Sequence, residues 1–247
     1  MERRKVISDK NGGKFRRFVF SGMSPHETYR YFINYIYPNV CPCCGEIIDH
    51  YEDFCELCHK RIRRYSENYR IEHVDEFVTY CVYEKAVRAA ILKLKIDARG
   101  NSYYAFACGI VNALREKGLD SEVDMVVYIP MTREEQRKRG YNLVKLIAKE
   151  IHYLLDIPCV GALSKIKKTQ KQKALLSAER KVNVVNAFKA VDKVNLKGKC
   201  VLVVDDLCTT GATLSEAARA LKDGGAEKVI AASFAKTKRD KLNKTLD

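Results

Sequence analysis

Val201-Leu-Val-Val-Asp205-Asp206-Leu-Cys-Thr-Thr-Gly-Ala-Thr213 is the segment from which the architecture can be inferred. Its four consecutive apolar residues are typical of a strand buried on both faces, as in a parallel sheet covered by helices. Asp205 and Asp206 follow the apolar run directly. Open α/β sheets bind their ligands at the carboxyl ends of their strands. The segment therefore predicts a ligand site at the end of a central strand.

The residues after the two acids have the chemistry of an anion cradle. Thr209 and Thr210 offer hydroxyls, Gly211 permits close approach of the backbone, and a helix expected from Thr213 adds its positive end. Because two carboxylates would repel a phosphate, we expect them to face vicinal sugar hydroxyls. The alternatives are a Mg²⁺ site of the Walker-B kind and an acidic helix cap, although the chain has no G-x-x-x-x-G-K-[ST] motif. The segment favours a phosphosugar site.

Strand and helix patterns alternate on both sides of this segment. Strands are expected at 77–83, 124–129, 157–163, 199–204 and 228–234, and helices at 84–95, 102–117, 141–155 and 213–223. Such alternation is typical of a doubly wound parallel sheet of the α/β class. We assign residues 74–240 to this domain.

Basic residues gather in a loop expected just after the strand that ends at Ile129. They are Arg133, Arg137, Lys138 and Arg139. Arginine contacts phosphates in a bidentate manner, and Gly140 permits a tight turn into the next helix, so these side chains can surround a pyrophosphate. The alternative is an ordinary solvated basic face.

Two groups of lysines also suit an anionic ligand. The run between residues 165 and 173 has few apolar anchors and predicts a loop that closes over a polyanion, grips a nucleic-acid backbone or is simply solvated. Lys95 stands near the end of a predicted helix, where the helix dipole favours cations. A phosphate contact by Lys95 is a further hypothesis.

Paired cysteines near the N-terminus predict a structural zinc site. The expected ligands are Cys41, Cys44, Cys55 and Cys58. They form two C-x2-C knuckles that can converge on one tetrahedral ion, in a segment too short for a core of its own. Cys43 is expected to be a bystander, and the alternatives are His50 or His59 as a ligand or a set of reduced buried thiols. We assign residues 24–64 to a helix, expected from Pro25 to Tyr37, plus this zinc ribbon.

Composition limits the class of partner. The 247 residues include 45 Lys and Arg against 31 Asp and Glu, a formal charge of +14, which favours nucleic acid, anionic lipid or a phosphate-rich ligand. No apolar run is long enough for a membrane helix, so we expect no membrane insertion. The basic residues 1–23 lack the apolar core of a signal peptide. We expect a flexible extension, a cytoplasmic protein, and ten cysteines that serve as thiols or metal ligands.

Three motifs carry a resemblance to a known family. Residues 205–213 resemble the phosphoribosyl pyrophosphate (PRPP) motif of type I phosphoribosyltransferases. Pro130 and the later Arg137-x-Arg139-Gly-Tyr-Asn142 resemble the P-x4–7-R-x-RG(F/Y)N segment of competence protein ComF and its GntX-like relatives. Residues 169–188, with Thr169, Gln172 and Arg180, are similar to the T-x-x-Q stretch of the same relatives.

The resemblance implies a type I phosphoribosyltransferase fold behind a small N-terminal zinc ribbon, with Zn²⁺ structural and Mg²⁺ accompanying PRPP. It assigns the ribose to Asp205 and Asp206, and the 5-phosphate to Thr209, Thr210, Gly211, Ala212 and Thr213. It assigns the pyrophosphate to Arg133, Arg137, Arg139 and Asn142, and a flexible loop to Thr169, Gln172 and Arg180.

Two functions follow as hypotheses. In the first, the chain is a phosphoribosyltransferase that transfers the pentosyl group of Mg²⁺-PRPP to an acceptor the sequence does not identify, and no catalytic residue is predicted. The ComF resemblance implies a role in DNA uptake and natural transformation, with DNA-uptake proteins as partners. In the alternative, the chain is a non-catalytic module that binds single-stranded DNA and keeps the PRPP site as a sensor or relic.

Overall fold

The computed structural model describes residues 24–96, 102–166 and 186–238. The predicted extension 1–23 and the loop residues Thr169, Gln172 and Arg180 lie outside the described residues. The chain divides into two compact units between Tyr37 and Pro38.

The first unit contains one described helix, α1 (Pro25–Ile36). Its start is fixed by a capping box, in which the Ser24 hydroxyl accepts from the Glu27 amide (3.2 Å) and the Glu27 carboxylate accepts from the Ser24 amide (2.9 Å). Pro25 occupies the first turn, where its missing N–H costs nothing. The helix predicted from Pro25 is confirmed.

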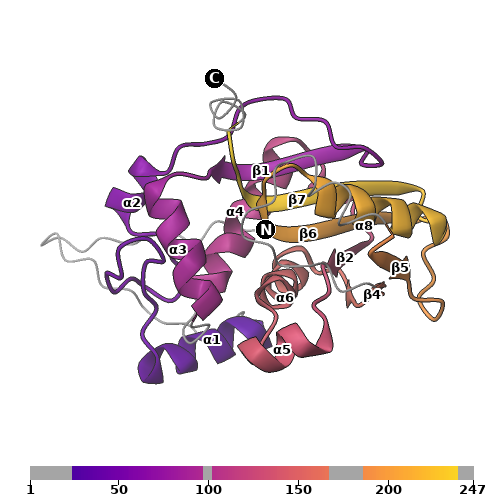
Figure 1. Cartoon of the computed structure of the whole chain (residues 1–247). Helices are drawn as coiled ribbons and strands as arrows, with labels where there is room; N and C mark the ends of the chain where they lie inside the picture. Colours follow the sequence, from indigo (N-terminus) through magenta and orange to yellow (C-terminus); the bar gives the residue numbers. More distant parts are fainter. Residues whose placement is uncertain (1–23, 97–101, 167–185, 239–247) are drawn as a thin grey trace, which may run out of the picture. The chain divides into compact units, whose positions relative to one another are not determined.

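The second unit is built on a five-stranded sheet in the order β1-β7-β6-β2-β3, with every neighbouring pair parallel (Figure 1). The strands are β1 (Glu76–Val82), β2 (Met125–Tyr128), β3 (Cys159–Val160), β6 (Cys200–Cys208) and β7 (Lys228–Lys236). The central strand β6 pairs with β7 on one side and β2 on the other. This arrangement confirms the predicted α/β class and parallel sheet.

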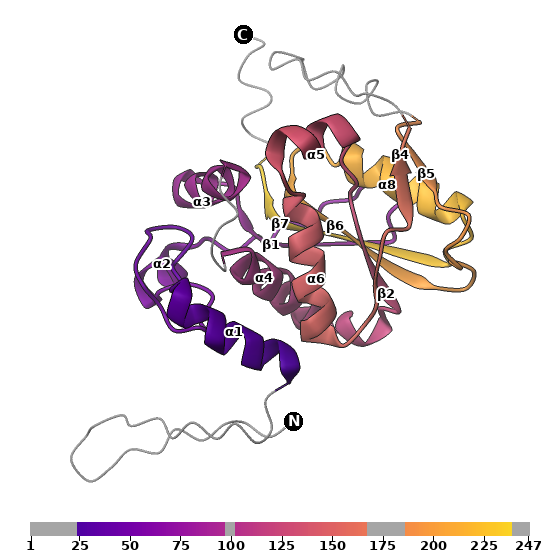
Figure 2. The same cartoon turned by 90° about the horizontal axis from the view of Figure 1, so that it is seen from below.

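Helices cover both faces of the sheet (Figures 1 and 2). The elements α4 (Ser102–Glu116) and α6 (Leu143–Leu155) contact one face, and α8 (Ala212–Asp223) contacts the other. Along β6, Leu202 and Val204 belong to the core beneath α4 and α6, whereas Val201 and Val203 belong to the core beneath α8. The apolar run is continuous because each of its side chains faces a helical layer.

The largest differences from the predicted strand bounds are in β6 and in the strand expected at 157–163. The strand β6 continues through both aspartates to Cys208, which pairs with Lys236, because β7 itself extends to Lys236 and offers a partner along that length. The strand expected at 157–163 is divided into β3 and β4 (Leu163–Lys165), which pairs antiparallel with the unpredicted β5 (Phe188–Ala190). The division falls at Gly161, where a Cβ would lie 3.0 Å from the Tyr128 hydroxyl.

The cysteine segment packs onto the domain. It contains the short helix α2 (Glu56–Arg61), and the chain then returns through β1 to α3 (Lys85–Ile96). The Phe54 ring lies 6.1 Å from the Phe234 ring and 6.5 Å from the Tyr80 ring. Ile48 and Ile62 join the same core. The cysteine segment is too short to form a core of its own, and its apolar side chains pack into the core of the sheet.

The remaining described helices are η1 (Asp120–Glu122) and α5 (Arg133–Arg139). Over the described ranges, no helix has both the length and the hydropathy that crossing a bilayer demands. The element that bears most on the site is α5, because it replaces the loop predicted after β2.

Candidate functional site

The two aspartates lie in the last part of β6, beside the end of α3. Asp206 is buried, and its carboxylate forms an ion pair with Lys95, whose Nζ lies 2.6 Å from Oδ2. The Asp206 amide donates to Oδ1 of Asp205 (2.9 Å). Burial and the Asp206 carboxylate together raise the pKa of Asp205 to about 8. The free protein therefore holds a proton on Asp205 at neutral pH.

The loop between β6 and α8 has a conformation that only glycine adopts easily at its last position. Gly211 caps α8 with φ +77°, in the left-handed region that disfavours a side chain. A Cβ there would also lie 3.0 Å from Cγ1 of Ile71. The glycine predicted for approach to an anion is thus required by the fold of the loop itself.

The side chains of Lys236 and Tyr69 hold this loop through its backbone carbonyls. Lys236, the last residue of β7, is 2% exposed, and its Nζ donates to the Thr209 carbonyl (2.6 Å) and the Thr237 carbonyl (3.0 Å). The same Nζ lies 4.0 Å from the centre of the Tyr69 ring, and the Tyr69 hydroxyl donates to the Thr210 carbonyl (3.0 Å). The Gly211 N–H, which follows the Thr210 carbonyl, is hydrogen-bonded to the Cys208 thiol. A buried ammonium thus holds this loop through a backbone carbonyl.

Lys236→Met is expected to weaken binding of a phosphate ligand about tenfold or more, because the loop loses the hydrogen bond that holds the Thr209 carbonyl in place. Hydrogen bonds to a charged group contribute about 1.5–3 kcal/mol. Methionine fills most of the same volume, so the fold should persist. Lys228→Met, at the start of β7, is the matched control. Titration with ribose 5-phosphate measures the affinity of each variant, and thermal unfolding shows whether each is folded. Equal affinities in the two variants would rule out a role of Lys236 in phosphate binding.

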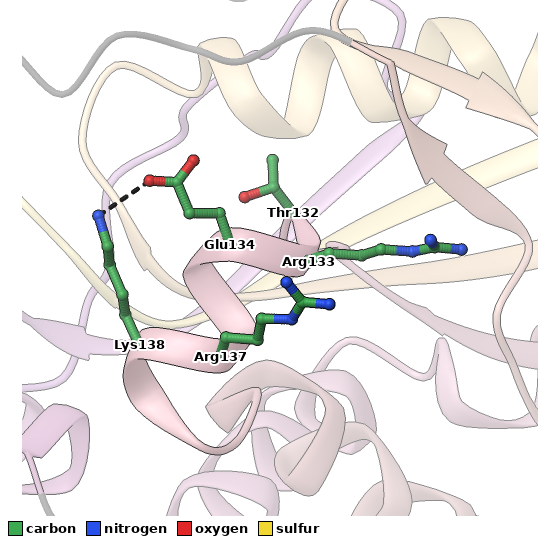
Figure 3. Close-up of a pocket in the computed structure, with 5 residues that line it drawn as sticks. All are labelled: Thr132, Arg133, Glu134, Arg137 and Lys138. Carbon is green, nitrogen blue, oxygen red and sulfur yellow. Dashed lines mark hydrogen bonds and ion pairs between the residues drawn. The ribbon is translucent and has the colours of Figure 1, made fainter.

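The predicted arginines lie on a helix at the same edge of the sheet. The end of β2 is adjacent to β6, with Tyr128 opposite Val204, and α5 follows β2 after a capping box formed by Thr132 and Glu135. Arg133 and Arg137 point to one side of α5, whereas Glu134 and Lys138 lie on the other and form an ion pair at 2.9 Å (Figure 3).

A helix places side chains four residues apart on one face. The two exposed guanidinium groups, of Arg133 and Arg137, therefore share one side of α5 and can bind one pyrophosphate. Together with Thr132, Glu134 and Lys138 they line a shallow hollow of about 500 Å³. The basic cluster is thus presented by a helix rather than by the loop expected from the sequence.

The other two predicted pyrophosphate residues differ in exposure. Arg139 is exposed at the end of α5, and Gly140 after it has φ +79°, which forms the predicted tight turn. Asn142 is buried, where its side chain accepts from the Lys145 amide (3.2 Å) and donates to the Ile129 carbonyl (3.1 Å). These contacts tie the start of α6 to the end of β2.

The four predicted metal ligands come together as one cluster. One sulfur from each of Cys41, Cys44, Cys55 and Cys58 lies within 4.8 Å of the others, and Cys44 Sγ lies 3.6 Å from Cys55 Sγ. Tetrahedral zinc, with Zn–S bonds of about 2.3 Å, requires sulfurs about 3.8 Å apart. The donor set and its spacing therefore fit a structural zinc ion.

The sequence did not predict the residues that contact the loop but lie far from it along the chain. Lys236 belongs by composition to the start of a polar tail, because the residues that follow it are polar or charged. Lys95 is a candidate phosphate contact from the sequence, whereas the structure pairs it with Asp206. A lysine ending an apolar strand is the one available signal for Lys236.

Comparisons with known proteins found a matching family, two curated relatives and a similar solved structure. The sequence profile of the family described as "Phosphoribosyl transferase domain" matches residues 137–246. Competence protein F of Haemophilus influenzae is 27% identical over 194 residues, covering 76% of this chain and 81% of that protein. The DNA utilization protein YhgH of Escherichia coli is 26% identical over 195 residues, covering 77% and 81%. Adenine phosphoribosyltransferase from Saccharomyces cerevisiae matches 62% of this chain and 78% of its own, with 16% identity and a TM-score of 0.40.

The family match and the parallel sheet together define the class, a type I phosphoribosyltransferase fold with a four-cysteine cluster before it. Within that class, the chain is a homologue of competence protein F and of YhgH over most of its length.

Proposed function

We propose that the carboxyl edge of the sheet binds Mg²⁺-PRPP or a related phosphosugar. The ribose hydroxyls face Asp205 and Asp206, the 5-phosphate occupies the loop from Thr209 to Thr213, and the pyrophosphate lies against α5. The placement of the two acids carries this proposal, because Asp205 and Asp206 lie at the end of the central strand, which leads directly into a loop that Gly211 turns into the start of α8.

The chemistry of this site is pentosyl transfer. An acceptor nucleophile attacks the anomeric carbon, the bond from that carbon to the pyrophosphate oxygen breaks, and pyrophosphate leaves with the electron pair. Arg133 and Arg137 stabilise the negative charge that develops on the leaving group. Mg²⁺ would supply further charge neutralisation when it is bound with PRPP.

The relatives' names support a role in DNA uptake. One is called competence protein F and the other a DNA utilization protein, and we assign the present chain to the same process, with DNA-uptake proteins as its partners.

Titration calorimetry can test the ribose 5-phosphate and pyrophosphate parts of the site separately. We expect saturable binding of Mg²⁺-PRPP, and weaker binding of ribose 5-phosphate and of pyrophosphate separately. Arg133→Gln/Arg137→Gln should weaken PRPP and pyrophosphate at least about tenfold, since removing each charged hydrogen bond costs about 1.5 kcal/mol or more, and should spare ribose 5-phosphate. Lys193→Gln/Lys197→Gln removes the same number of charges from exposed positions before β6 and is the matched control. Absence of PRPP binding to the unaltered protein would refute the proposal.

A second candidate is a non-catalytic module that binds single-stranded DNA. The observation that favours it is a basic groove beside the phosphate loop, lined by cations from separate segments of the chain. This candidate predicts DNA binding that survives Asp205→Asn/Asp206→Asn, whereas binding of PRPP does not.

A further inference from the structure

The end of α3 places a lysine on the acid pair. Lys95 Nζ lies 2.6 Å from Oδ2 of Asp206, whose side chain is only 10% exposed. The Asp206 amide donates to the Asp205 carboxylate (2.9 Å), so the two acids and the lysine belong to one site. An ion pair this far from water is favourable only where its partners are held in good geometry. The value of the pair therefore depends on what fixes Lys95.

Three features hold Lys95 in this position. It lies in the last turn of α3, where the helix dipole favours a cation. Leu94, the residue before it, is buried in the core beneath α4 and α6. The Tyr141 hydroxyl donates to the Leu94 carbonyl (2.5 Å), which ties this end of α3 to the segment between α5 and α6. The backbone that carries Lys95 is thus fixed by the core on one side and by a hydrogen bond on the other.

A divalent cation does not fit the same place while the lysine is there. Mg²⁺ binds carboxylate oxygens at about 2.0–2.1 Å in a nearly octahedral shell. An ammonium 2.6 Å from Oδ2 fills part of that shell and repels an ion of its own sign. With a proton on Asp205, the remaining charges of Asp206 and Lys95 cancel. The free acid pair is therefore poorly suited to attract a metal ion.

We infer that Lys95 is the resident cation of the acid pair: it neutralises Asp206 in place of a metal ion and keeps that carboxylate directed at the ribose hydroxyls. The inference rests on the proposed phosphosugar site and adds a positioning residue to it. A metal ion then reaches the site only with the pyrophosphate of PRPP. A pentose 5-phosphate, which has no pyrophosphate, therefore binds without a metal ion.

The first test measures binding of Mn²⁺, a paramagnetic substitute for Mg²⁺, to the protein without a phosphosugar. By electron paramagnetic resonance, Lys95→Met should bind Mn²⁺ at least about tenfold more tightly than the unaltered protein, because a positive charge beside the metal position is gone. Lys95→Met/Asp206→Asn should lose this gain. A merely structural role of Lys95 predicts no gain in metal affinity.

Lys93→Met is the matched control, because it removes the same charge from the same helix. Lys93 is exposed, and its Nζ would lie 3.8 Å from a Cβ on Gly45, so it faces the cysteine segment. Its variant should bind Mn²⁺ within about threefold of the unaltered protein, since solvent and salt screen an exposed charge.

Calorimetric titration with ribose 5-phosphate, in Mg²⁺ or in EDTA, is the second test. The unaltered protein should bind the ligand equally well in both solutions. In EDTA, Lys95→Met should bind it at least about tenfold more weakly, because the uncompensated Asp206 carboxylate repels the phosphate. Mg²⁺ should restore part of that affinity. Thermal unfolding shows that each variant is folded.

Two results would overturn the inference. One is a Mn²⁺ affinity of Lys95→Met that equals that of the unaltered protein, or a gain that survives Asp206→Asn. The other is a large loss of ribose 5-phosphate affinity when the unaltered protein is moved from Mg²⁺ to EDTA. Failure of the unaltered protein to bind ribose 5-phosphate in either solution would instead refute the phosphosugar site, and the Mn²⁺ titrations would still decide whether Lys95 excludes a metal ion.

Discussion

Cys58→Ser is expected to release the bound metal and to lower the unfolding free energy of the second unit by several kcal/mol. Structural zinc contributes about 10–16 kcal/mol of apparent binding energy to zinc-finger peptides at neutral pH, and a whole domain is stable by only about 5–15 kcal/mol. The loss of stability extends beyond the knuckles because Phe54, next to Cys55, packs on Tyr80 and Phe234 in the main core. The thermal midpoint of the whole unit should therefore fall.

Cys43→Ser is the matched control for this prediction. Cys43 lies between two ligands in the sequence but outside the four-sulfur cluster, so its variant should keep one zinc per chain and nearly the original midpoint. Zinc content by atomic absorption and unfolding by calorimetry provide the two readouts. Metal lost from the Cys43 variant, or retained at full occupancy by the Cys58 variant, would show that the ligand set is different.

The elements of the sheet could be predicted because each is encoded locally. The apolar run of β6 and the helical periodicity of α3, α4 and α6 appear in contiguous residues. The bounds of β6 and the hairpin of β4 with β5 could not be predicted, since they depend on partners distant in sequence: β6 extends to Cys208 because Lys236 lies opposite, and the three-residue β5 pairs with β4 across the segment 166–187.

The same distinction applies to the candidate site. Asp205, Asp206 and the threonine loop are adjacent in sequence, so their chemistry could be interpreted together. The Tyr69 hydroxyl and the Thr210 carbonyl that accepts from it are separated by 141 positions. No periodicity relates such residues, and a lone tyrosine in a polar segment has many uses. The groups that anchor the loop could be found only once the sheet had brought them together.

Binding of Mg²⁺-PRPP is expected to strengthen steeply with pH up to about 8, which is the pKa of Asp205 in the free protein. An ionised carboxylate accepts stronger hydrogen bonds from sugar hydroxyls and attracts Mg²⁺, so the bound state favours the deprotonated form. Below pH 8, each further drop of one pH unit then lowers the affinity for Mg²⁺-PRPP by up to about tenfold. Calorimetric titrations between about pH 6 and pH 9 measure this slope.

The stability of the free protein should change with pH in the opposite direction to its affinity for Mg²⁺-PRPP. Between the ordinary carboxyl pKa near 4 and the raised value of about 8, the native state binds a proton that the unfolded state does not, so the unfolding free energy falls as pH rises through this window. In Asp205→Asn this fall should be absent, and the remaining weak PRPP binding should follow only the titration of the ligand's own phosphates. Because that ligand titration is common to both proteins, the difference between their slopes isolates Asp205. Identical slopes in the variant and the unaltered protein would mean that Asp205 keeps its charge throughout, and that the proton is held elsewhere in the site.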